Sequence, residues 1–433
     1  MVYKYKISPW LVGAALLLGL PETVIKYPWG IPVPIQNAGT LIIAFVACFV
    51  YLKMPRRHPK TGTIGSKLLG SVLLYTCLVG AVSYAEVDFH WYLYLRELSY
   101  FTLCLSGIVL GTQINPNELT KICEKILLSV GLSLIACTLL LSARGIGVVD
   151  PLTGRIIDGS LYNYSNLIFI LCPIIVANSQ RSSGYILFLA ALSTTSLLGF
   201  AMVSGTRSVL LESLILILLT LYFAWKKIGR TILNGRNIFA LLVAVAFTVT
   251  VALIYDGTAL FNRIVDSDIK SDARSQELND FFEMKDRWFP VGAGIGVGFH
   301  TIIVADTTSA FGDGKGKHIA LVSAPHIGIF AWPIKAGLMA IPLLMFMIFQ
   351  ALKSLMLIPG RRGVIINFFT GLPPLIAIGS ISGGWNTIEL LLTGIILGCG
   401  THYQVTLGSR SNFSRRLHVL TPNQFALSSR STA

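Results

Sequence analysis

The feature that most constrains this chain is a series of apolar runs, each about 16 to 22 residues long, that recur along nearly its whole length. A helix of this length spans the hydrocarbon core of a membrane and satisfies its own backbone hydrogen bonds there. Composition agrees, because 54% of the 433 residues are hydrophobic and 12% are charged, against about 25% charged in a soluble domain. We therefore expect an all-α integral membrane protein.

The apolar runs predict about twelve transmembrane helices. They lie near residues 10–25, 36–52, 68–84, 97–112, 126–143, 161–178, 184–203, 208–225, 238–255, 334–355, 364–381 and 385–400. The first run resembles a signal peptide, but Pro21, Glu22 and Lys26 follow it in place of a small-residue cleavage site. We therefore interpret it as a retained helix.

The distribution of basic residues predicts the orientation. Outside the longest loop, the even-numbered connections carry most of the Lys and Arg residues, for example around 53–67 and 226–236. Cytoplasmic loops are enriched in Lys and Arg, so both termini are expected in the cytoplasm. Residues 1–400 then form one polytopic membrane domain, 256–333 a long non-cytoplasmic loop, and 401–433 a Ser-rich tail typical of disorder.

The net charge of +14, from 34 Lys and Arg against 20 Asp and Glu, would suggest nucleic acid as a partner of a soluble protein. No aromatic and basic platform accompanies it, so we expect no nucleic-acid partner. The seven cysteines lie in or beside apolar segments without a CxxC pair, which argues against a disulfide framework or a zinc site. Asp266 and Asp268 resemble a metal-binding DxD only by their spacing, so we assign no metal and no cofactor.

The long loop contains two patterned segments. RSQELNDFFEMKDRWF places Leu278, Phe281, Phe282 and Met284 between charges, which predicts a short amphipathic helix lying on the membrane surface. Four glycines then alternate with small apolar residues in 290–299, without the Lys-Ser/Thr pair of a nucleotide-binding loop. We expect a tight backbone turn that packs against a substrate or a helix.

Basic side chains gather on the non-cytoplasmic side. Arg207 lies between two predicted spans, Arg274 and Arg287 lie in the long loop, and His326 precedes the tenth span. Each has a simpler interpretation: a snorkelling interfacial arginine for Arg207, pairing with nearby aspartates for the two loop arginines, and a structural role for the histidine. Their position on one side of the membrane favours an anion site with a nearby base. His300 and His318 are weaker candidates.

Three more ionisable residues lie within or beside predicted spans. Ionisable groups are costly in lipid and indicate function. Glu212 and Glu389 are expected to orient Arg207 or Lys335 as counter-ions. A proton or sodium pathway is the alternative.

The order of these features resembles the O-antigen ligase and Wzy-type polysaccharide polymerase superfamily. The shared features are the GTRS turn at Arg207, a long outer loop with Arg274 near its start, the stretch VGAGIGVGF, and His326 entering a helix that contains Gly337. The resemblance is best over residues 200–345. The family histidine is often followed by Asn, whereas Ile327 follows here.

The resemblance implies a bacterial inner-membrane glycosyltransferase, active on the periplasmic side without a metal. Members move a glycan from undecaprenyl pyrophosphate to a hydroxyl of a sugar acceptor. Arg207 and Arg274 look like the arginines that bind the pyrophosphate, and His326 looks like the catalytic base. Arg287 with Gly298 looks like a loop motif of the polymerases. The implied partners are the undecaprenyl-linked oligosaccharide, the glycan acceptor, membrane lipid, and a chain-length regulator or flippase.

Three functions remain open at this point. Polymerisation of O-antigen or exopolysaccharide repeat units ranks ahead of ligation to lipid A core, although both share the donor chemistry. A transporter of an anion or a lipid-linked glycan is the rival from another class. Transporters commonly contain inverted repeats and broken helices, and the sequence shows no convincing repeat.

Overall fold

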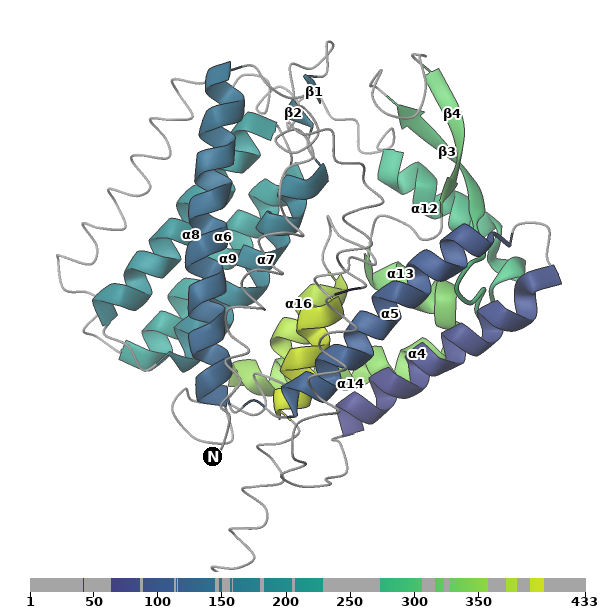
Figure 1. Ribbon diagram of the computed structural model, residues 1–433, viewed down its shortest axis with the longest axis horizontal. Helices are drawn as coiled ribbons and strands as arrows, with labels where there is room; N and C mark the ends of the chain where they lie inside the picture. The colour runs from purple at the N-terminus through teal and green to yellow at the C-terminus, as the bar shows by residue number, and fades with distance from the viewer. Residues whose placement is uncertain are drawn as a thin grey trace, which may run out of the picture.

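The computed structural model describes residues 42, 64–85, 89–112, 114, 116–144, 148–149, 156–157, 159–179, 183–204, 207–228, 273–305, 316–322, 328–356, 371–379 and 390–400 (Figure 1). The described elements are α4 (Ile64–Val82), η1 (Ser83–Ala85), α5 (Trp91–Gly111), α6 (Pro116–Arg144), β1 (Val148–Val149), β2 (Ile156–Ile157), α7 (Gly159–Asn178), α8 (Ser183–Ser204), α9 (Arg207–Ile228), α12 (Ala273–Glu283), η4 (Lys285–Arg287), β3 (Phe299–Ala305), β4 (Gly316–Val322), α13 (Gly328–Ala336), η5 (Gly337–Met339), α14 (Ala340–Met356) and α16 (Leu372–Gly379).

The helical membrane architecture expected from the apolar runs is confirmed. Among the described residues, six helices are long and apolar enough to cross a membrane, and Val209–Phe223 and Leu390–Gly400 form shorter apolar helices. The predicted spans 10–25 and 238–255, and all of 36–52 except Ile42, lie outside the described residues. The total of twelve spans and the orientation therefore stay predictions.

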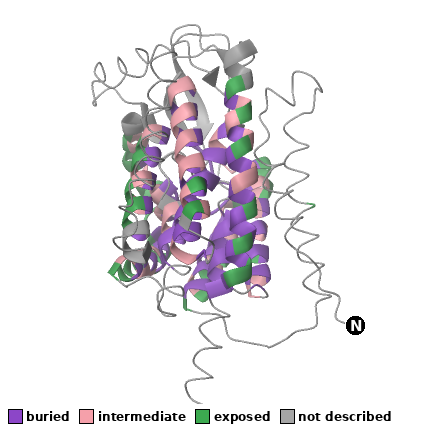
Figure 2. Cartoon of the chain, turned by 90° about the vertical axis from the view of Figure 1, so that its left-hand side faces the viewer, coloured by how far each residue is buried: buried purple, intermediate pink, exposed green. Residues whose placement is uncertain are grey.

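The outward faces of the helices are apolar, as lipid contact requires. On α14 the exposed residues Ile341, Met345, Phe349, Leu352 and Met356 recur every three or four positions, along one face of the helix. In the side view of Figure 2, exposed and half-buried residues occupy the outer faces of the helices, and buried residues gather between them. Water would not be a favourable solvent for such a face.

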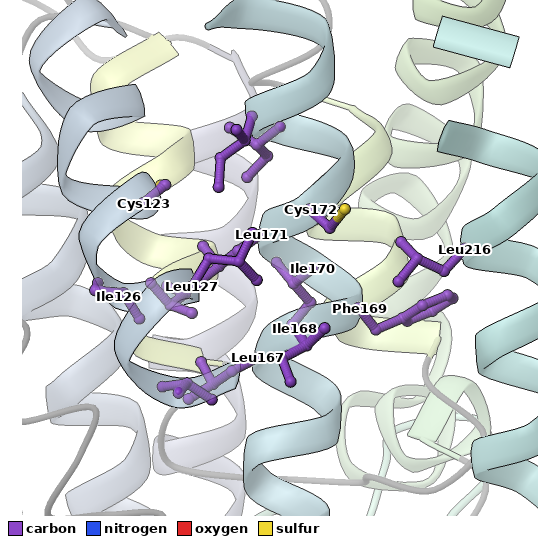
Figure 3. Packing of buried hydrophobic residues seen from close by; sticks show 14 of the residues in the cluster. Cys123, Ile126, Leu127, Leu167, Ile168, Phe169, Ile170, Leu171, Cys172 and Leu216 are labelled. Carbon is purple, nitrogen blue, oxygen red and sulfur yellow. The ribbon is translucent and has the colours of Figure 1, made fainter. Parts of the chain in front are cut away.

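Helices α6 to α9 pack together around one hydrophobic core. Ile126 and Leu127 of α6 meet the run Leu167–Cys172 of α7, with Leu216 of α9 on its other side (Figure 3). The run on α7 is buried all round, which is expected of a helix enclosed by others.

A second core joins α4, α5, α13, α14 and Leu390–Gly400. Gly107 and Gly111 of α5 face Gly394 and Gly398 of the last helix so closely that a Cβ on any of them would overlap the opposite backbone. This is the small-residue packing that lets membrane helices approach without a hydrophobic driving force.

Two small hairpins depart from the expected all-α chain. β1 pairs antiparallel with β2, and β3 pairs antiparallel with β4, with Phe299 opposite Val322. Both hairpins lie at the same end of the helix bundle (Figure 1), which we call the hairpin end. β3 and β4 are rich in β-branched residues, and outside lipid a segment is free to satisfy its backbone in a hairpin.

Helix α12 forms where the amphipathic pattern predicts it, and protein covers part of its apolar face. Phe281 is fully buried, and its ring centroid lies 4.9 Å from that of Phe299. The Trp288 indole N–H donates to the carbonyl oxygen of Phe281 at 2.9 Å. Phe282 of the same predicted apolar set is 44% exposed, so the expectation that α12 lies on the membrane surface stays a prediction, with Phe281 packed against protein.

Candidate functional site: a glycine loop inside the bundle

The glycine-rich segment 290–298, here called the glycine loop, folds back into the helix bundle. Gly292, Gly294 and Gly296 have φ angles of 96°, 71° and 88°, a left-handed region that is costly for other residues. Residues 292–298 are all buried. The alternating glycines are thus explained by backbone conformation and by close packing.

The loop packs against the C-terminal half of α4. The Ile295 N–H donates to the carbonyl oxygen of Thr76 at 3.2 Å, and the Tyr75 hydroxyl donates to the carbonyl oxygen of Val291 at 2.8 Å. A Cβ on Gly80 would lie 2.7 Å from the backbone nitrogen of Ile295. The prediction of a tight turn that packs against a helix is confirmed.

On its other side the loop fills a break in the tenth predicted span. The structure divides this span into α13, η5 and α14, and Gly337 has a φ of 56° at the break. The break leaves the last carbonyls of α13 without partners in their own helix. The N–H groups of Ala293 and Gly294 donate to the carbonyl oxygens of Ile334 and Lys335, each at 2.9 Å.

A buried ion pair joins the loop to two helices. Lys335 Nζ lies 3.1 Å from Oε1 of Glu97 and donates to Oε2 at 3.2 Å and to the Val297 carbonyl oxygen at 3.0 Å. The Gly296 N–H donates to the same Oε2 at 2.8 Å. Lys335 is 0% exposed and Glu97 is 2% exposed, so both charges depend on these partners.

These contacts place the loop well below the helix ends. Thr76 lies six residues before the end of α4, Glu97 six residues after the start of α5, and Lys335 seven residues after the start of α13. At 1.5 Å per residue each position is about 9 to 10 Å from its helix end. Non-helical backbone at such a depth is tolerated where protein buries it, as it does here.

The hydrogen bonds also limit what the loop can bind. The N–H groups of residues 292–296 all donate to protein acceptors: Trp288, Ile334, Lys335, Thr76 and Glu97. A phosphate-binding loop needs such donors directed at its ligand. The glycine loop therefore anchors itself to the surrounding helices. Its N–H groups at residues 292–296 are not directed at a substrate, which was the other alternative from the sequence.

Arg287 lies on the exposed side of an aromatic cluster. Its Cζ is 5.9 Å from the ring centroid of Phe299, within the range of a cation–π contact. The side chain is exposed in η4, and beneath it Phe281, Trp288 and Ile334 share one buried cluster with Phe299. The contact holds the guanidinium beside β3.

The other predicted site residues are only partly described. Arg207 is the first residue of α9, and two residues separate it from the end of α8, as the short turn predicted. Arg274 is the second residue of α12. Their side chains, together with His326 and Glu389, lie outside the described residues. The predicted convergence of Arg207, Arg274 and His326 therefore stays a prediction.

Glu212 is buried in the other helix group. It is 1% exposed and lies five residues after the start of α9. Helix α9 packs on α7, where Cys172 Sγ lies 3.8 Å from Thr220 Oγ1. Lys335 is paired with Glu97, so of the two partners expected for Glu212 only Arg207 is left, and that pairing stays a prediction because the Arg207 side chain lies outside the described residues.

Glu97 is the residue that sequence reasoning missed. It opened a predicted span and was assigned no role, although a carboxylate inside an apolar run is costly and needs a partner. One signal was available: Glu97 and Lys335 are the first and second residues of the predicted spans 97–112 and 334–355, whose starts are both expected on the non-cytoplasmic side. Among the described residues, no group of three or more His, Cys, Asp or Glu could hold a metal ion.

Comparison with known proteins adds no relative: the chain matches no protein-family model, no curated protein and no solved structure. The family resemblance therefore rests on the motifs and their order along the chain.

Proposed function

We propose that this chain is a bacterial inner-membrane glycosyltransferase that moves a glycan from undecaprenyl pyrophosphate to a sugar hydroxyl on the periplasmic side. The observation that best supports the proposal is the contact between α12 and α13. The ring centroids of Phe282 and Phe330 lie 5.9 Å apart. Arg274 is in the first turn of α12, and α13 begins two residues after His326. One aromatic contact thus links the two segments assigned to donor binding and to proton transfer.

The donor chemistry suits arginine. Pyrophosphate is a good leaving group, so the enzyme need not protonate it, but negative charge grows on the bridging oxygen as the sugar departs. Guanidinium groups form two parallel, charge-assisted hydrogen bonds to phosphate oxygens. In the proposal Arg207 and Arg274 stabilise this charge, and Arg287 makes a weaker contribution from its position in η4.

The acceptor chemistry suits histidine. A sugar hydroxyl is a poor nucleophile and must lose its proton as it attacks. A neutral imidazole, with an unperturbed pKa near 6.5, is able to accept that proton. The proposal assigns this role to His326. A single direct displacement inverts the configuration at the anomeric carbon, and no step requires a metal.

Within this reaction class we favour polymerisation of O-antigen or exopolysaccharide repeat units over ligation to lipid A core. The two reactions share the donor and differ only in the acceptor. The loop motif of Arg287 and Gly298, which looks like that of the polymerases, is the feature that favours polymerisation.

A transporter is the second candidate, and one observation favours it. The break at Gly337 lies nine residues inside its span, and transporters bind substrates at such discontinuous helices. Here, however, the carbonyl oxygens of Ile334 and Lys335 at the break accept hydrogen bonds from the glycine loop. Among the described residues the break is occupied by protein, which weakens this candidate.

The decisive experiment incubates the purified protein in detergent with undecaprenyl-linked repeat units, with and without lipid A core. We expect a ladder of lipid-linked products. Capture of the glycan only on the core would identify a ligase. Absence of product with either acceptor, together with flux into liposomes, would identify a transporter. Arg181→Ala, in a connection expected on the opposite side, is a matched control that should retain full activity.

A further inference from the structure

The ion pair between Glu97 and Lys335 takes part in neither the donor binding nor the proton transfer proposed above. Its two residues are 238 positions apart, on α5 and α13, and both contact the glycine loop between them. The loop in turn leads from α12 into β3. Three parts of the chain therefore meet at one pair of charges inside the bundle.

We propose that Glu97 and Lys335 are positioning residues that lock the glycine loop at its depth and so hold α12 and α13 in the arrangement needed for transfer. This inference rests on the proposed function. Two adjacent backbone groups of the loop are recognised together: the Gly296 N–H by Glu97 and the Val297 carbonyl by Lys335. The side chains of Ala293, Ile295 and Val297 are buried as well. The ion pair therefore adds a polar constraint to contacts of the loop that are otherwise apolar.

The geometry argues against a direct role of Lys335 in binding phosphate. An ammonium group has three N–H donors. Nζ of Lys335 has the two oxygens of Glu97 and the Val297 carbonyl oxygen within 3.0 to 3.2 Å, and the side chain is fully buried. Two of the three donors are used in hydrogen bonds, and protein encloses the whole ammonium group. A substrate has no access to it there, so an effect of Lys335 on transfer has to pass through the loop.

The position of the ion pair explains how the loop influences the segments that carry the reacting groups. Ile334, next to Lys335, belongs to the same buried cluster as Phe281 and Trp288, which fix α12. Lys335 itself is nine residues after His326. If the loop leaves its place, the carbonyls of α13 lose their donors and the cluster loses Ala293 and Val297 together. The distance between the donor-binding and base segments is then no longer set.

The lock can be tested without any substrate. In a background lacking the native cysteines, Val297→Cys replaces a side chain that is 2% exposed, and its reaction with a membrane-impermeant maleimide reports loop release. We expect Glu97→Gln or Lys335→Met to raise the labelling rate at least about tenfold, since each leaves one buried charge without its partner. Lys285→Cys, which replaces an exposed residue of η4, should label equally fast in every variant.

Activity then separates positioning from binding. Each single variant should lower kcat more than it changes KM for the donor. The double variant Glu97→Gln with Lys335→Met removes both charges and keeps a side-chain acceptor for the Gly296 N–H. It should restore slow labelling and most of the turnover. A residue that touched the substrate would show no such recovery.

The outcomes are distinct. Single variants that keep both wild-type labelling and wild-type turnover would refute the lock while leaving the proposed function in place. A double variant with slow labelling but no turnover would make Lys335 a ligand and would also overturn the positioning role. A wild-type protein that transfers no glycan refutes the proposed function and the positioning role with it.

Discussion

Gly80 offers the most direct test of the loop's place in the bundle. It lies on the face of α4 that contacts the glycine loop. A Cβ there would overlap the carbonyl oxygen of Ile295 and would lie 2.7 Å from its nitrogen and 2.9 Å from its Cγ1. The nitrogen cannot move away without loss of its hydrogen bond to Thr76. Gly80→Ala should therefore push the loop out of contact with α4.

The expected magnitude follows from three contributions. Overpacking costs about 1 to 3 kcal/mol, and the lost Ile295 hydrogen bond costs about 1 kcal/mol. Alanine in place of glycine stabilises a helix by about 1 kcal/mol. The net loss is about 1 to 3 kcal/mol. Gly70→Ala in the same helix is the matched control, because its Cβ would meet only Leu105 Cδ2 at 4.0 Å.

The assay is thermal unfolding in detergent, followed by tryptophan fluorescence, with Trp288 and Trp332 as buried reporters near the loop. We expect Gly80→Ala to lower the Tm by a few degrees and Gly70→Ala to leave it unchanged or raise it. If the two variants melt together at the wild-type temperature, the loop does not lie against α4 and the depth argument is wrong.

Three further predictions concern the proposed chemistry. Arg207→Ala and Arg207→Lys should insert normally yet lose most glycan transfer, because an ammonium does not form the bidentate contact; a wild-type rate in the lysine variant would make Arg207 a lipid anchor. Arg274→Ala and His326→Ala should abolish transfer in the detergent assay, and full activity of purified His326→Ala would remove the base assignment. Arg287→Ala should only reduce transfer, since its side chain is exposed in η4; complete loss would give it a central role.

The helices were the most predictable part of the fold. Predicted spans at 161–178 and 184–203 correspond to α7 (Gly159–Asn178) and α8 (Ser183–Ser204). Length and apolarity are local properties, so a single sequence is sufficient to find them. The start of α6 at Pro116 was missed by ten residues, because its first turns are polar and extend beyond the apolar run.

The faces of the elements were less predictable. The pattern of α12 correctly indicated an amphipathic helix, yet Phe281 is buried against Phe299 and not in lipid. The tenth span was expected to be continuous, although Pro333 and Gly337 were visible in the sequence. Whether such residues break a membrane helix depends on a partner for the released carbonyls, and that partner is supplied by residues 293 and 294.

By itself, the sequence determined that the chain folds as membrane helices and that its glycines 292, 294 and 296 belong to a special backbone segment. The first conclusion follows from the apolar solvent that long apolar helices require, and the second from the backbone conformations that glycine adopts readily. Only the tertiary structure decided that this segment enters the bundle and that Glu97 is the partner of Lys335. A buried charge must have a counter-ion, but which of several distant carboxylates supplies it depends on how the helices pack.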